Sequence, residues 1–318
     1  MRVFLTGGSG VLGRALIPAF VAAGHSVDAL AVTDEAAATV AALGGRPVAG
    51  DLLDRRGLDP ITADVVAHFA TSIPRPGAGT GSWVLNDQIR TVGTANLLRA
   101  AAAGGVGRVV AYSVIWVYGD HGDDWITEET PLPGRTRPEI LSAVALEEAV
   151  RDSGLEWVIV RGGHLYGPGT GTTEELLAAA ARGTLMTDGA GDAFDSLVTA
   201  ADTAQVAVLA VERVPAGTIL NAVDDRPMRQ RELYEALAAY VGGPEPGRGP
   251  VVPGWGSLRV SNARARSYGF RPRHADVTSG LRALYGVEPD DARVPDAPPP
   301  PAGAGGGGRR RCRAAWPA

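Results

Sequence analysis

The chain of 318 residues contains no lysine, and its 30 basic residues are all arginine. Arginine keeps its proton in proteins and cannot form a Schiff base, so it is a poor proton shuttle. Any mechanism that requires a lysine amine is therefore excluded. Acidic residues number 35, which gives a net charge of −5. This balance offers no basic surface for a nucleic-acid partner.

Cysteine is almost as scarce as lysine, because Cys312 is the only one. A single cysteine excludes a disulfide framework and a cysteine metal site, and it fits a reducing compartment. The sequence has no run of about 18 apolar residues, so no segment is expected to span a membrane. Residues 1–20 lead directly into glycines and do not resemble a signal peptide. We therefore expect a cytoplasmic protein.

Short apolar runs alternate with helical patterns along the first half of the chain. This alternation predicts βαβ units, and hence an α/β fold with a doubly wound parallel sheet of the Rossmann type. Continuous apolar strands fit a sheet that is covered on both faces. Strands are expected at 2–6, 26–32, 46–49, 64–69, 108–114 and 156–161, and helices up to residue 23 and at 35–43, 83–103 and 139–153.

Three glycines follow the first expected strand and open a helix: Gly7, Gly10 and Gly13. In this setting the first glycine permits a tight turn and the second lets backbone approach a pyrophosphate. The third allows close packing of helix and strand, with the helix N-terminus facing the anion. The loop therefore predicts dinucleotide binding. Arg14 could reach a 2′-phosphate or be an ordinary solvated helix residue, and the sequence leaves both open.

The chain is expected to have three parts. Residues 1–170 are predicted to form the nucleotide-binding Rossmann domain, and 171–288 a smaller substrate-binding lobe with helices at 174–182, 229–241 and 276–285 and one strand at 218–223. Residues 289–318 are rich in proline, glycine and arginine. Such a segment cannot bury enough apolar surface to fold, so we predict a disordered tail.

Several later motifs occur in a characteristic order: 50–54 (GDLLD), 66–71 (VAHFAT), 91–98 (TVGTANLL), 117–119 (VYG) and 161–169 (RGGHLYGPG). Together with the glycine loop they resemble the extended short-chain dehydrogenase/reductases, the NAD-dependent epimerase/dehydratase family. The resemblance covers roughly residues 1–285. It implies an NAD or NADP site at the carboxyl ends of the strands, with a small-molecule substrate held between the lobes.

The resemblance assigns cofactor contacts by position. Gly7, Gly10 and Gly13, with Val11 and Leu12 between them, would bind the pyrophosphate. Asp51 and Leu52 would flank the adenine. Ala70 and Thr71 would line the ribose and nicotinamide side, and Gly162 and Gly163 would bring backbone near the carboxamide. The choice between NAD and NADP stays open, because the second strand ends in Ala31, Val32 and Thr33 before Asp34.

The chain departs from the family at the catalytic positions. Counting along the helix at 139–153 puts Glu139 at the position of the family's catalytic tyrosine and Ala143 at that of its lysine. The usual catalytic serine or threonine aligns with Val114, one residue after Ser113, and a helix asparagine is replaced by Arg90. The pattern resembles the atypical branch, in which the fold persists and the catalytic residues differ.

Other side chains near the expected strand ends are candidates for the chemistry. His164 can transfer protons near neutral pH and is the leading catalytic candidate, with Tyr118 and Ser113 as hydrogen-bond donors. Ser72, Arg90 and Trp116 are expected to contact substrate. For Arg90 the partner is either an anionic substrate or the carboxylate of Asp51, and the sequence leaves both open. The acidic and histidine residues at 120–124 match no metal-site spacing, so no metal is expected.

Three functions fit this sequence. The first is an NAD(P)-dependent oxidoreductase or epimerase with a substitute proton donor, acting in a biosynthetic pathway such as that of a natural product. The second is a non-redox dehydratase, isomerase or cyclase on the same fold. The third is a nucleotide-sensing regulator of the NmrA type without catalysis. The sequence fixes no oligomeric state, and a homodimer is among those it allows.

Overall fold

The computed structural model describes residues 1–54, 58–74, 81–133, 137–252 and 254–286. The predicted tail at 289–318 lies outside the described residues. In the described part, no helix is both long enough and apolar enough to cross a membrane.

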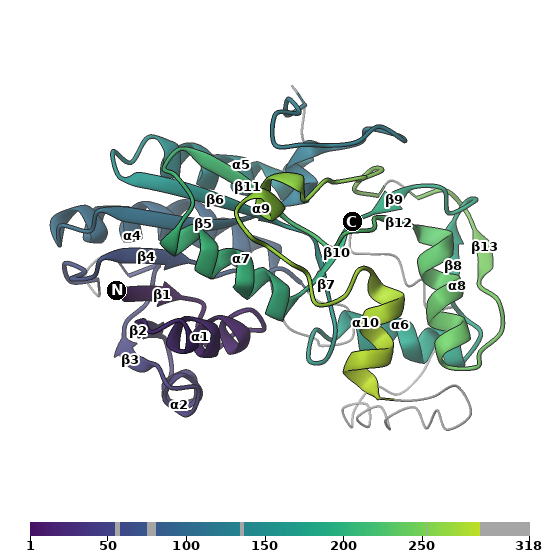
Figure 1. Cartoon of the computed structure of the whole chain (residues 1–318), viewed down its shortest axis with the longest axis horizontal. Coiled ribbons are helices and arrows are strands. Elements are labelled where there is room, and N and C mark those ends of the chain that lie inside the picture. Colours follow the sequence, from purple (N-terminus) through teal and green to yellow (C-terminus); the bar gives the residue numbers. More distant parts are fainter. Residues whose placement is uncertain (55–57, 75–80, 134–136, 253, 287–318) are drawn as a thin grey trace.

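A parallel sheet of seven strands forms the centre of the larger lobe (Figure 1). Its order is β3-β2-β1-β4-β5-β6-β11, which is the Rossmann order with one strand added at an edge. The predicted fold class is thereby confirmed. The strands are β1 (Arg2–Thr6), β2 (Ser26–Ala31), β3 (Arg46–Ala49), β4 (Val65–His68), β5 (Arg108–Val114), β6 (Glu156–Gly162) and β11 (Thr218–Ala222).

Helices cover both faces of this sheet, as the continuous apolar strands predict. On one face, α1 (Gly13–Ala22) packs against α7 (Ala200–Glu212). On the other, α4 (Thr94–Ala103) packs against α5 (Pro138–Arg151). Alternate strand residues supply the two cores: Val110 faces the first pair of helices, while Val109 and Ala111 face the second. Helix α2 (Asp34–Ala42) also belongs to this lobe and lies against β2 and β3.

The expected long helix at 83–103 contains a break. It consists of α3 (Trp83–Gln88), a π-helical turn (Ile89–Gly93) and α4. Turns of this kind are rare and are often found at functional sites. This one turns Arg90 into the protein interior, where its side chain is fully buried.

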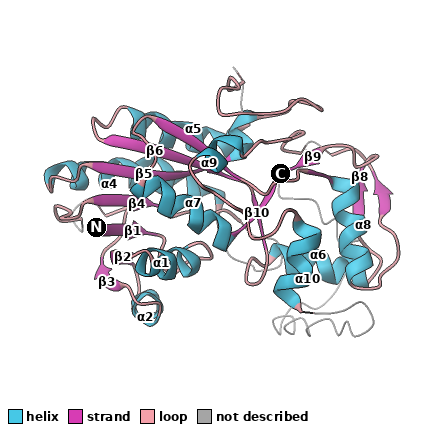
Figure 2. Ribbon diagram, viewed as in Figure 1, coloured by secondary structure: helices cyan, strands magenta, loops and turns pink. Residues whose placement is uncertain are grey.

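A smaller lobe lies beside the carboxyl ends of the sheet strands (Figures 1 and 2). Its core packs α6 (Thr172–Ala181), α8 (Gln230–Tyr240) and α10 (Val277–Tyr285). Short strands surround them, in the pairs β7 (His164–Tyr166) with β10 (Leu197–Thr199), β9 (Phe194–Asp195) with β12 (Met228–Arg229), and β8 (Met186–Asp188) with β13 (Gly247–Gly249). The short α9 (Ala263–Ser267) lies against β11.

The chain returns to the large sheet after residue 170. Both α7 and β11 belong to the Rossmann layers, and β11 pairs with β6 along its whole length. The expected strand at 218–223 therefore exists, but in the central sheet and not in the smaller lobe. The proposed division near residue 170 remains a prediction, with α7 and β11 assigned by contact to the larger lobe.

Candidate active site

The glycine loop between β1 and α1 has the geometry that a dinucleotide requires. Gly7 has φ +82°, a conformation that favours glycine. A Cβ on Gly13 would lie 2.2 Å from the carbonyl oxygen of Gly8, so only glycine lets the helix approach the loop. A Cβ on Gly10 would meet only the oxygen of Gly7, at 3.4 Å, and otherwise enter open space. That open space is where a pyrophosphate could approach the backbone.

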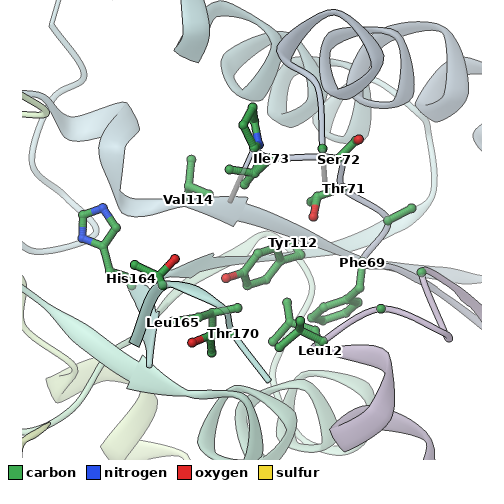
Figure 3. A pocket seen from close by; sticks show the side chains of 18 of the residues that line it. Leu12, Phe69, Thr71, Ser72, Ile73, Tyr112, Val114, His164, Leu165 and Thr170 are labelled. Carbon is green, nitrogen blue, oxygen red and sulfur yellow. The ribbon is translucent and has the colours of Figure 1, made fainter. Parts of the chain in front are cut away.

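A cavity of about 420 Å³ lies against this loop, at the carboxyl ends of the strands (Figure 3). It brings together most of the residues expected to bind cofactor or substrate: Gly7, Gly10, Val11, Leu12, Ala70, Thr71, Ser72, Trp116, Gly163 and His164 all line it. Phe69, Tyr112 and Val114 complete its wall near β4 and β5. Strand ends are where this fold places its ligands.

Other predicted contacts lie elsewhere. Asp51 and Leu52 line none of the described cavities; the Asp51 carboxylate accepts a hydrogen bond from the backbone of Leu53 (2.9 Å), and Leu52 is buried. Arg14 lines a neighbouring cavity that shares Ser9, Gly10 and Val11 of the glycine loop with the first, and residues 31–34 at the end of β2 do not contribute to it. The 2′-phosphate contact suggested for Arg14 therefore stays a prediction without support from this geometry.

Three tryptophans form a cluster, here called the aromatic wall: Trp116 lines this cavity, Trp255 lines a neighbouring one, and Trp83 lines neither. The rings of Trp116 and Trp255 stack, with centroids 4.4 Å apart and an interplanar angle of 7°. Trp83 meets both of them edge-on, at 6.5 and 6.0 Å. The indole N–H of Trp255 is buried and has no hydrogen-bond partner among the described residues. Trp83 and Trp255 were not among the expected residues, because neither is near the others in sequence.

His164, at the start of β7, makes hydrogen bonds through both ring nitrogens. Trp116 donates its indole N–H to Nε2 (2.5 Å), and Nδ1 bonds to the carboxylate of Asp195. Because an indole N–H can only donate, Nε2 carries the lone pair and Nδ1 the proton. The ring is thereby held as a neutral tautomer, and proton donation from Nε2 would require Trp116 to move. The catalytic role of His164 stays a prediction.

Tyr118 and Ser113 lie outside the described cavities. The fully buried Tyr118 donates its hydroxyl to Asn221 Oδ1 (2.8 Å), and the guanidinium of Arg161 stacks on its ring at 4.6 Å. Burial raises the pKa of Tyr118. Ser113 is also fully buried, on the opposite face of β5 from Tyr112 and Val114. The geometry thus gives the two residues structural surroundings, and their catalytic roles remain predictions.

Arg90 is placed differently from either expected arrangement. It lines none of the described cavities, and it forms no hydrogen bond with Asp51. Its guanidinium is fully buried, and none of its three nitrogens has a hydrogen-bond partner among the described residues. Burial lowers its pKa to about 10. The arginine therefore remains charged at neutral pH.

A second cavity, of about 850 Å³, adjoins the first at His164. It lies by the smaller lobe and is rich in charged residues: Asp120, Asp123, Asp188, Asp192, Asp195, Arg229 and Arg231. Trp255 lines it as well. No group of three histidine, cysteine or acidic side chains that could hold a metal ion is present in the described ranges.

The family model of the NAD dependent epimerase/dehydratase family matches residues 3–222. The chain belongs to this family. The match runs from β1 to the end of β11 and so includes all seven strands of the central sheet apart from the first residue of β1. The family resemblance is confirmed, and with it an enzyme fold built for a nicotinamide dinucleotide.

Reductases are among the similar family members. A 3-diazoavenalumate denitrifying reductase from Streptomyces sp is 33% identical over 314 residues, covering 88% of this chain and 99% of that protein. A 4-hydroxy-2-methyl-3-oxo-4-farnesyl-3,4-dihydroquinoline-1-oxide ketoreductase from Stigmatella aurantiaca is 31% identical, covering 74% of this chain and 72% of its own. The dTDP-glucose 4,6-dehydratase of Streptomyces venezuelae, solved with NAD bound, superimposes with a TM-score of 0.72 at 25% identity, covering 90% and 96% of the two chains.

Tyr112 is a further residue of this site that was not expected from the sequence. Its side chain lines the cavity beside the glycine loop, and Figure 3 shows its hydroxyl directed inward. A signal for it exists in the sequence. Side chains alternate along a strand, so Val114 and Tyr112 must share a face of β5 while Ser113 takes the other. The motif alignment drew attention to Val114 but not to its neighbour two residues earlier.

Proposed function

We propose that this protein is an NAD(P)H-dependent reductase of a planar aromatic small molecule. One observation carries the proposal: the cavity that borders the glycine loop also reaches Trp116, whose indole stacks on Trp255. The cofactor would lie beside the glycine loop and the substrate ring beside Trp116. Hydride transfer needs the two in contact, and one cavity can hold them so.

The cofactor end is supported by the packing of the glycines. The space open at Gly10 and the close approach at Gly13 are the features by which this loop type admits a pyrophosphate. Gly7, Gly10, Val11 and Leu12 would hold the phosphates, and Ala70 and Thr71 would border the nicotinamide half. When bound, the reduced cofactor supplies a hydride. NAD and NADP remain alternatives.

The clustering of tryptophan side chains supports the binding of an aromatic substrate ring beside Trp116. Three of the six tryptophans in the chain lie together in the aromatic wall. Aromatic pairs gain about 0.5–1.5 kcal/mol beyond their buried area, so such a wall favours a flat conjugated ring. The unpartnered N–H of Trp255 would add a hydrogen-bond donor. Two of the relatives are named for reductions, one of a diazo compound and one of a quinoline oxide.

The reaction would place hydride on an electrophilic group of the ring system and a proton on its oxygen. With an aromatic ketone the product is an alcohol. With an ortho-quinone diazide, hydride adds to the terminal nitrogen and the electron pair moves onto the ring oxygen, which takes a proton to become a phenol. The N–H hydrogen then leaves nitrogen as a proton while the C–N bond breaks, N₂ departs, and the ring carbon takes up a proton to form a C–H bond. Each reaction consumes one NAD(P)H and one proton. Neither can use a lysine, because the chain has none.

The test is oxidation of NADH and NADPH by the full chain with three probes. These are an aryl ketone, an ortho-quinone diazide with N₂ detected by mass spectrometry, and a sugar nucleotide. We expect turnover with one of the two aromatic probes and none with the sugar nucleotide. Product formed without net cofactor oxidation would instead support a dehydratase or isomerase. Cofactor binding without turnover on any probe would support the nucleotide-sensing alternative.

A further inference from the structure

We propose that Tyr112 donates the proton to the substrate oxygen, with Arg90 as the buried counter-charge that positions the reaction. The inference rests on the proposed reductase function. The family's catalytic tyrosine and lysine align with Glu139 and Ala143 on α5. The proposal gives the tyrosine's role to Tyr112 on β5 and the role of the positive charge to Arg90 on the π-helical turn. Tyr112 would be the catalytic residue, and Arg90 would act through it.

Tyr112 is held firmly with its hydroxyl in the cavity. Its ring stacks on Phe69, with centroids 5.4 Å apart and an interplanar angle of 26°. Its hydroxyl end lies against the backbone of Gly162, where a Cβ would be only 2.1 Å from Oη. No described residue forms a hydrogen bond with this hydroxyl, and in Figure 3 it points toward the segment that carries His164 and Leu165. A hydroxyl so placed can donate to a ligand.

Arg90 is fully buried, none of its three guanidinium nitrogens is hydrogen-bonded to a described residue, and its positive charge acts on this phenol. The phenol is among the groups whose charge favours the protonated guanidinium, together with the carboxylates of Asp87 and Glu147. Burial raises the pKa of Tyr112, and the charge of Arg90 opposes that rise. The phenol therefore starts protonated, and the arginine stabilises the phenolate that remains after it donates. The three unpartnered nitrogens of Arg90 leave its charge available for that purpose.

The other hydroxyl and imidazole candidates are less suitable. The lone pair of His164 Nε2 is occupied by the indole N–H of Trp116, which holds the ring neutral. Ser113 faces away from the cavity, and Tyr118 donates its hydroxyl to Asn221. In the described part of the chain, Tyr112 is the tyrosine whose side chain lines the cavity beside the glycine loop.

The proton and electrons balance in this step. As hydride from NAD(P)H reaches the substrate, an electron pair moves onto the substrate oxygen. That oxygen takes the proton of Tyr112, so the phenolic O–H bond breaks and the product O–H bond forms. The substrate is reduced by two electrons, and NAD(P)⁺ remains. Tyr112 is left as a phenolate, which the charge of Arg90 stabilises, and it regains a proton from water after the product leaves.

The decisive variant is Tyr112→Phe, which removes one oxygen and keeps the ring on Phe69. We expect kcat to fall at least about 100-fold, the usual worth of general acid catalysis. The Kd for NADPH and the melting temperature should change little. By calorimetry, the product alcohol or phenol should bind about three- to tenfold more weakly, because one hydrogen bond is lost. Tyr268→Phe removes a hydroxyl from a residue that does not line the cavity and should leave all four quantities unchanged.

Arg90 is tested by Arg90→Met and Arg90→Lys. The methionine variant should lower kcat with KM nearly unchanged, and the lysine variant, which keeps a cation, should recover most of it. If Arg90 had a purely structural role, both variants would have a lower melting temperature, and the lysine variant would not recover kcat relative to the methionine variant. A Tyr112→Phe variant with kcat within about threefold of the wild type, and unchanged product binding, would overturn the inference while the reductase function stands. A wild type that oxidises neither NADH nor NADPH with any probe would overturn both.

Discussion

The phenol of Tyr112 occupies the space that a side chain at residue 162 would need. A Cβ on Gly162 would lie 2.1 Å from Oη and 2.4 Å from Cε2 of the ring. The two residues sit on neighbouring strands, β5 and β6, and are separated by fifty positions in sequence. The glycine that the family resemblance assigned to the cofactor carboxamide is therefore also the residue that admits this ring.

This pairing predicts a strong coupling between the two positions. Gly162→Ala should destabilise the protein by about 1–3 kcal/mol, as overpacking of a filled core does. In a Tyr112→Ala background the same change should cost almost nothing, because the space is then vacant. Chemical denaturation of the wild type, both single variants and the double variant measures this coupling. Additive effects of the two changes would contradict the contact.

Two glycines of the loop are expected to have different roles: Gly10 is needed for cofactor binding, and Gly13 is needed for folding. Gly10→Ala should fold normally, because its new Cβ meets only Gly7 O at 3.4 Å, yet it should abolish cofactor binding by blocking the pyrophosphate. Gly13→Ala would force a Cβ to 2.2 Å from Gly8 O and should lower the melting temperature. Calorimetry with NADH and NADPH, together with thermal unfolding, distinguishes the two. Unchanged affinity in the Gly10 variant would argue that no dinucleotide binds at this loop.

His164→Ala distinguishes two roles for the histidine. If it holds Trp116 and the aromatic wall in place, KM for the substrate should rise several-fold while kcat stays within about threefold. If it is the proton donor expected from the sequence, kcat should fall by at least about tenfold, because general acid catalysis typically contributes about 100- to 10,000-fold. Asp195→Asn is the companion variant, since it keeps the size of the group bonded to Nδ1. A large loss of kcat would contradict the assignment to Tyr112.

A buried ion pair between α5 and β6 should make a large contribution to stability. Glu147 accepts two hydrogen bonds from Arg161 (2.9 and 2.7 Å) and one from Arg151 (2.8 Å), and Glu147 and Arg161 are almost fully buried. Removing one partner leaves a buried charge uncompensated, so Glu147→Ala should cost about 3–5 kcal/mol. Glu148→Ala, at the exposed neighbouring position, should cost little. Urea unfolding measures both, and equal effects would contradict the prediction.

The stability of the fold should fall on acidification partly through His68. Burial, followed by the charge of Arg90, lowers the pKa of His68 to about 4 from 6.5. Between these values the unfolded chain binds a proton that the folded chain does not, so stability decreases as pH falls from 6.5 toward 4. The full difference is worth about 3 kcal/mol. In His68→Gln the melting temperature should depend less steeply on pH in this window; an unchanged slope would exclude His68 as a contributor.

The sequence predicted the elements whose pattern is local. Strands β1 to β6 and the helices between them lie within a few residues of their expected bounds, because apolar periodicity and glycine turns determine them. Helix α7 was missed, although Thr199 caps it by accepting from the backbone N–H of Asp202 (3.0 Å). The expected strand at 218–223 was found but assigned to the wrong lobe, because a sequence pattern does not say which sheet a strand joins.

In the candidate site, too, local sequence motifs could be located in advance, whereas contacts between distant segments could not. The glycine loop and residues 70–72 could be located from motifs, since each motif is a contiguous segment that lies against the cavity. The partners of His164 could not, because Asp195 and Trp116 reach it from other elements. The burial of Arg90 depends on the π-helical turn, which shifts the register of a helix that reads as continuous in the sequence.

The near-parallel stacking of Trp116 on Trp255 gives the molecule an optical probe of its own. Two indoles 4.4 Å apart couple their electronic transitions, so this pair should contribute a characteristic near-ultraviolet circular dichroism signal. The emission of tryptophan overlaps the absorption band of reduced nicotinamide. Excitation energy should therefore pass from the wall to a cofactor bound in the cavity that Trp116 lines, and intrinsic fluorescence can report occupancy without any label.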